Sequence, residues 1–89
     1  MGLQESEINN MNRLYAEWKR ILIKQIGLEM FLHEFASAKC FVRGDSDLYY
    51  KGFLKEFNFT DNDMAFDAYI TGDSLALIEI GIKNGDYKK

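Results

Sequence analysis

The chain has 89 residues, of which 47% are apolar, and this length allows a single domain over residues 1–89 with one modest core. Eleven basic residues against 14 acidic ones give a net charge of −3, which argues against direct binding of nucleic acid by a basic surface. One cysteine excludes an internal disulfide, and no apolar run reaches the ~20 residues that span a bilayer. We therefore expect a cytoplasmic protein without membrane contact.

The N-terminal part of the chain has the periodicity of an amphipathic helix. Between residues 8 and 26, apolar side chains recur at intervals of three and four. On the opposite side, Glu17 and Arg20 are spaced to pair across one turn. The apolar pattern resumes after Gly27, which is a poor helix residue. These features predict a helical half over about 5–38, consisting of a long helix that is bent or broken near Gly27.

The second half, residues 39–84, is predicted to form a small antiparallel β-meander of about four strands. Eight of the 29 residues in 41–69 are aromatic, and such density favours a pleated surface. Further along, Ile78, Ile80 and Ile82 alternate with other residues, as in a strand with one buried face. The resulting fold class is α+β, in which the N-terminal helix packs on the meander.

An all-α fold is the alternative. Tyr50, Phe53 and Phe57 also satisfy helical spacing. Thr60 followed by Asp63 resembles a capping box at the start of a helix, with Asp in place of the usual Glu or Gln.

The sequence offers no credible catalytic or metal-binding constellation. Glu29, His33 and Ser37 lie four residues apart along one helix, but amides inside a helix are already bonded and cannot stabilise an oxyanion. A single histidine and a single cysteine leave too few ligands for a transition metal, and we expect Cys40 to be a small buried residue. We predict no enzymatic activity, no cofactor and no metal site.

Residues 52–58 carry a resemblance to a known family. The stretch Gly-Phe-Leu-Lys-Glu-Phe-Asn, with Asn62 shortly after it, resembles the Gly-X-Leu-X-X-Phe-Asp…Asn stretch of Sm-like RNA-binding barrels. The resemblance implies a helix followed by a strongly bent sheet, with RNA contacts at Asn58 and Asn62. An Sm-like RNA binder is the least favoured of three functional hypotheses.

The strongest functional signal is an uneven distribution of charge. Segment 56–82 contains six acidic residues and no lysine or arginine: Glu56, Asp61, Asp63, Asp67, Asp73 and Glu79. The electric field of such a segment attracts a basic partner. The favoured hypothesis is therefore a non-enzymatic acidic module that docks a sheet face on a basic surface of a larger protein. It would act as an inhibitor or regulator of the kind that phages and mobile elements use, including mimics of nucleic acid.

The second hypothesis is a structural or assembly subunit. A chain this short has little core with which to cover a long apolar stripe, so the stripe could pair with its copy in a homodimer. The candidate interface residues on the N-terminal helix are Met11, Leu14, Trp18, Ile21 and Leu22.

Overall fold

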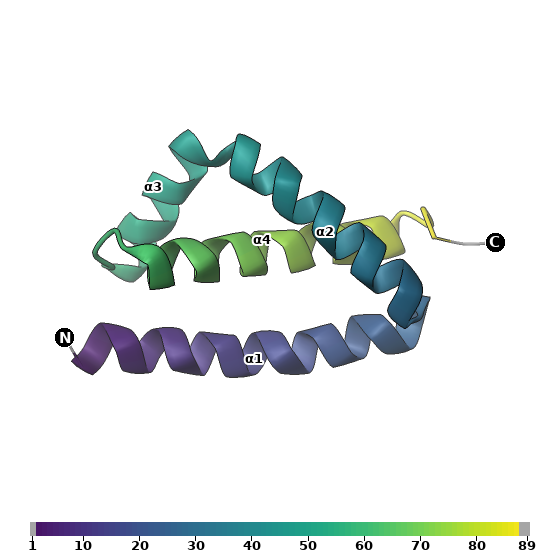
Figure 1. The fold of residues 1–89 in the computed structure, drawn as a ribbon, viewed down its shortest axis with the longest axis horizontal. Helices are drawn as coiled ribbons and strands as arrows, with labels where there is room; N and C mark the ends of the chain where they lie inside the picture. The colour runs from purple at the N-terminus through teal and green to yellow at the C-terminus, as the bar shows by residue number, and fades with distance from the viewer. Residues whose placement is uncertain (1, 88–89) are drawn as a thin grey trace.

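The computed structural model describes residues 2–87, which fold into four α-helices joined by short connections. The helices are α1 (Gly2–Ile26), α2 (Leu28–Gly44), α3 (Ser46–Phe57) and α4 (Asp63–Lys83). Helices α1 and α4 run side by side in the same direction, α2 crosses them diagonally, and α3 leads back to the start of α4 (Figure 1).

The long N-terminal helix and its break near Gly27 are confirmed, but the helical stretch continues past residue 38 to Gly44. Helix α1 buries Ile8 and Leu22 completely, and Arg20 pairs with Glu17 on its exposed side. The helical stretch is broken at Gly27, where φ is 89° and ψ is 153°. This region of backbone space is essentially limited to glycine, because any Cβ would collide with the backbone. The chain therefore reverses at Gly27, and α2 packs back on α1.

The predicted β-meander and the α+β fold class are wrong, because none of the described residues forms a strand. Residues 39–84 instead form the end of α2 and the whole of α3 and α4, as the all-α alternative has it. The aromatic side chains fill the space between α3 and α4. The ring of Tyr50 lies 5.0 Å from that of Phe66, and the ring of Phe53 lies 5.7 Å from that of Tyr69, between centroids.

The alternation of isoleucines has a different cause from strand pairing. In α4, Ile78 is buried, Ile82 is partly buried and Ile80 is 52% exposed. Helix α4 has apolar residues around most of its circumference. Isoleucines can therefore occur at alternate positions of this helix without a sheet. Its first turn is capped by Asn62, whose side-chain oxygen accepts a hydrogen bond of 2.9 Å from the Ala65 amide.

The Sm-like barrel implied by residues 52–58 is also wrong. Residues 52–57 lie in α3, and Asn58 ends that helix in the left-handed conformation. Asn62 caps α4, as described above. Asn58 therefore ends one helix and Asn62 caps the start of the next, and asparagine is common in both positions.

Helix α4 is the centre of the core. Its Ala65 and Ala68 pack with Ile8 of α1, its Leu75 and Ile78 pack with Leu22 and Phe31, and its Tyr69 and Ile70 pack with Val42 of α2. A buried side chain of this size contributes roughly 1.5–3 kcal/mol relative to an exposed one. All three clusters thus depend on the same helix.

The packing around α4 is incomplete. Helix α3 has 12 residues against 21 in α4, and it contacts α4 mainly through the aromatic side chains near the start of α4. Within residues 2–87, no Cα atom of α1 lies within 8 Å of one in α3. The backbones of α1 and α3 thus stay apart, whereas Phe53 and Leu54 of α3 pack against the same core cluster as Ile8 of α1.

The predicted oligomer interface is largely used within the chain. Leu22 is fully buried, and Met11 and Trp18 pack partly buried against the core. Leu14 and Ile21 remain 68% and 54% exposed. Among residues 2–87, no helix is both long and apolar enough to cross a membrane.

We expect Gly27→Ala to lower the free energy of unfolding by about 1–3 kcal/mol, because alanine would be strained at this φ and ψ. Urea denaturation followed by circular dichroism measures this loss. The matched control is Gly44→Ala, where φ is not positive and a Cβ meets nothing within 4 Å. Equal stability of Gly27→Ala and the control would contradict the role of Gly27.

Candidate functional site

A cavity of about 440 Å³ opens between α1 and α3, with α4 as its floor. We call it the aromatic cleft. Helix α1 contributes Tyr15 and Trp18, α3 contributes Tyr49, Gly52, Phe53, Glu56 and Phe57, and α4 contributes Tyr69, Gly72 and Asp73. Six of these side chains are aromatic and two are carboxylates, and none of the lining residues is a lysine or an arginine.

The α1 wall is held by two contacts with α4. A Cβ at Gly72 would lie 2.5 Å from the Tyr15 hydroxyl oxygen, so the missing side chain lets Tyr15 rest directly on the α4 backbone. The Trp18 indole Nε1 donates a hydrogen bond of 2.9 Å to Glu79 Oε1. This bond fixes the orientation of the indole ring, which is partly buried against the core.

The α3 wall follows from helical spacing. Tyr49, Phe53 and Glu56 recur at intervals of four and three, which places them on one side of the helix, next to Phe57. The rings of Phe53 and Phe57 lie 5.1 Å apart between centroids. A Cβ at Gly52 would meet nothing within 4 Å, so this glycine leaves the mouth of the cleft open.

The floor carries a tyrosine–carboxylate pair. Burial and the negative charge of neighbouring Asp73 raise the pKa of Tyr69 to about 12. Burial also raises the pKa of Asp73, and its interaction with Tyr69 offsets part of that increase. Burial also raises the pKa of Tyr15. Asp73 itself remains exposed at the edge of the cleft.

This arrangement is chemically suited to an organic cation. The faces of aromatic rings attract ammonium and guanidinium groups with about 0.5–2 kcal/mol each, depending on desolvation. Carboxylates at the same place add charge-assisted hydrogen bonds. The Trp18 face with Glu56 and Asp73 provides both kinds of interaction within one cleft.

The six predicted acidic residues do not form a single face. Glu56 and Asp73 line the cleft, whereas Asp61 accepts a hydrogen bond of 2.7 Å from Tyr50 and Glu79 holds Trp18. Asp63 and Asp67 are exposed. An α-helix turns by about 100° per residue, so the six steps from Asp67 to Asp73 fall about 120° short of two full turns. Asp67 and Asp73 therefore point in directions about 120° apart around α4. The expected acidic sheet face is wrong, because residues 2–87 form no sheet.

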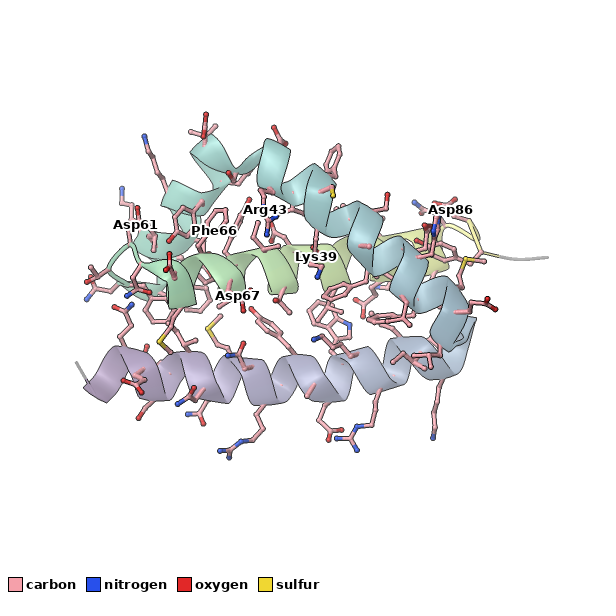
Figure 2. All side chains as sticks on the ribbon, viewed as in Figure 1. Lys39, Arg43, Asp61, Phe66, Asp67 and Asp86 are labelled. Atoms are coloured by element: carbon pink, nitrogen blue, oxygen red, sulfur yellow. The ribbon has the colours of Figure 1, made fainter. Side chains whose placement is uncertain are left out.

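The positions of the outlying charges can be followed in Figure 2. Asp61 lies at the connection between α3 and α4, Asp67 lies in the early part of α4, and Lys39 and Arg43 extend from α2. Lys39 is 4.8 Å from the centre of the Phe35 ring, which Lys19 of α1 also approaches, at 5.1 Å. These two lysines therefore lie at the α1–α2 contact, and the lining of the cleft includes no lysine or arginine.

Outside the cleft, the described part of the chain brings together no candidate metal site. Residues 2–87 contain no group of three His, Cys, Asp or Glu residues that could hold a metal ion. His33 is exposed and lies 4.0 Å from Glu34. Cys40 is exposed on α2, so the expectation that it is buried is wrong.

Sequence reasoning missed most of the aromatic lining. It singled out Glu56 and Asp73 for their charge and Trp18 as an interface candidate, but not Tyr49, Phe57 or Tyr69. The spacing of Tyr49, Phe53 and Glu56 would have indicated a shared side, had residues 46–57 been taken as a helix.

Comparison of the chain with protein-family models, with curated proteins and with solved structures finds no match. The functional argument therefore depends on the geometry of the site.

We expect two of the five tyrosines, Tyr50 and Tyr69, to ionise near pH 12 instead of 10. Burial is the main cause at both residues, and a neighbouring aspartate adds to it. The folded chain holds these protons more tightly than the unfolded chain, so their contribution to stability is complete below pH 10 and is lost between pH 10 and 12. Tyrosinate absorbance during alkaline titration measures this, and Tyr50→Phe should remove one late step. Ionisation of all tyrosines near pH 10 while the chain remains folded would contradict the expectation.

Proposed function

We propose that this chain is a non-enzymatic binding module that holds a basic side chain of a larger partner protein in the aromatic cleft. The observation that carries the proposal is the lining of the cleft, which combines six aromatic rings with Glu56 and Asp73 and includes no positive charge. A lysine or arginine side chain has the length to reach into such a cleft with its apolar stem against the rings.

The cleft favours binding at this position over the acids outside it. Asp73 is exposed like Asp63 and Asp67, but it alone of the three lines the cleft, where burial raises its pKa. The outlying acids add to the field that guides the partner toward the chain, and this contribution decreases with salt.

An inhibitory or regulatory role fits a module of this size. A chain of 89 residues that covers a basic surface of a larger protein prevents other ligands from reaching that surface. We place the protein in the cytoplasm, where its single exposed thiol, Cys40, would stay reduced.

Assembly through α1 is the second candidate function, and the exposure of Leu14 and Ile21 favours it. These two side chains lie on the same side of α1 as Trp18, at intervals of four and three residues. Sedimentation of the free chain tests it, since Leu14→Glu with Ile21→Glu would dissociate such an oligomer.

Replacing both cleft carboxylates, Glu56→Gln with Asp73→Asn, should weaken retention of the basic partner by about tenfold or more. The immobilised chain is exposed to a lysate of its native cells, and the retained proteins are quantified by mass spectrometry. The matched control is Asp63→Asn with Asp67→Asn, which removes the same charge outside the cleft and should cause a smaller loss. Equal retention by both double variants would contradict the cleft as the binding site.

A variant that fills the cleft gives an independent test. Gly52→Leu should abolish retention of the same partner, because the new side chain extends from the open mouth of the cleft. We expect the variant to be at least as stable as the natural chain, since leucine favours a helix by up to about 1 kcal/mol over glycine. Gly44→Leu is the control, at a helical glycine that also has open space and does not line the cleft. Unchanged retention by Gly52→Leu would oppose the proposal.

A further inference from the structure

A second cavity, of about 260 Å³, continues the aromatic cleft along α4. The two cavities share Tyr49, Tyr69 and Asp73. Beyond these three residues, the second cavity is lined by Phe41, Val42, Asp45, Ala76 and Leu77, and we call it the apolar groove.

The floor of the groove is an uncovered side of α4. Asp73, Ala76 and Leu77 line the groove, and Ile80 lies beyond the lining, three residues after Leu77 on the same side of the helix. Leu77 is 37% exposed and Ile80 is 52% exposed. Helix α3 packs on the first half of α4 and is too short to reach this part. The exposed fraction of these large side chains indicates a surface that another element covers.

Phe41 of α2 extends the apolar surface at the edge of the groove. Its side chain is 64% exposed, although it lies next to the buried Val42. An exposed phenylalanine beside Leu77 and Ala76 offers an aromatic anchor for a partner, as in many protein interfaces.

The shape of this surface fits a helix. The seven steps from Asp73 to Ile80 span about 10 Å along α4, which is two turns of a helix laid against it. Apolar residues at intervals of three and four on an incoming helix would fill the spaces between these side chains. Such a helix would complete the packing around α4, whose other sides are covered by α1, α2 and α3.

The charges around this surface select a basic helix. Asp45 and Asp73 line the groove and Glu56 lies in the adjoining cleft, whereas neither lining includes a lysine or an arginine. A second copy of the chain fits less well, because a two-fold contact through this patch would bring Asp45 and Asp73 close to their own copies.

We propose that the groove and the cleft together bind one amphipathic helix of the partner protein. Its apolar ridge lies on Leu77, Ile80 and Phe41, and a lysine or arginine near one end of it enters the aromatic cleft. This inference rests on the proposed function and adds the secondary structure of the bound segment to it.

The test uses a displayed library of random peptides of about 18 residues, which is five turns of helix. Peptides are selected on the whole chain, and their affinities are then measured by fluorescence anisotropy on three proteins. These are the natural chain, Ile80→Glu, and the control Leu32→Glu. Leu32 is 56% exposed on α2, and nine residues place it half a turn away from Phe41.

We expect selection to enrich peptides with apolar residues at helical spacing and at least one basic residue. Their affinity should fall about tenfold or more for Ile80→Glu and stay unchanged for Leu32→Glu. Failure to enrich any peptide, enrichment of acidic or extended sequences, or equal binding by the two variants would overturn the inference. It would also be overturned if the free chain dimerises and Ile80→Glu dissociates the dimer.

The proposed function can be judged separately. A native partner that is lost by Glu56→Gln with Asp73→Asn but retained by Ile80→Glu supports the cation-binding cleft and overturns the helix inference. A partner that is indifferent to the cleft variants overturns the proposed function itself.

Discussion

Helix α4 carries apolar side chains around most of its axis, and the other three helices pack against it. Ile8 and Leu22 of α1 and Phe31 and Val42 of α2 reach their buried positions by contacting α4, and Tyr50 and Phe53 of α3 are partly buried against the same core. A helix with so much apolar surface is unstable in water on its own, so the fold depends on covering it. The break at Gly27 serves this end, because it turns α2 back over α1 and α4.

The cleft results from the same constraint. The other three helices cannot surround α4 along its full length, and within residues 2–87 no Cα atom of α1 lies within 8 Å of one in α3. The aromatic side chains that line the cleft are anchored in the core at one edge and open to solvent at the other. Binding surface and core therefore share residues, such as Phe53 and Tyr69, which contribute to both.

The sequence predicts the first half of this fold well and the second half poorly. The apolar stripe of α1 has one clear period because only one side of α1 is buried. Gly27 is recognisable as a break because glycine is a poor helix residue. Helix α4 lacks such a period, because the residues on most of its sides are apolar. Strand-like alternation at Ile78, Ile80 and Ile82 then arises without a strand. The cleft is formed by side chains from three helices. The sequence shows the charges of Glu56 and Asp73, but it does not show that these two residues line the same cleft.

Because Tyr15 rests on Gly72, the residue at position 72 determines the width of the cleft. Every residue other than glycine at position 72 would push the Tyr15 ring away from α4, while Glu56 and Asp73 would keep their places on α3 and α4. In the proposed function, the carboxylates select a positively charged ligand and the space between the rings sets the size of its head group. A single methyl group at position 72 would then change the size of the accepted ligand and leave the preference for a cation in place.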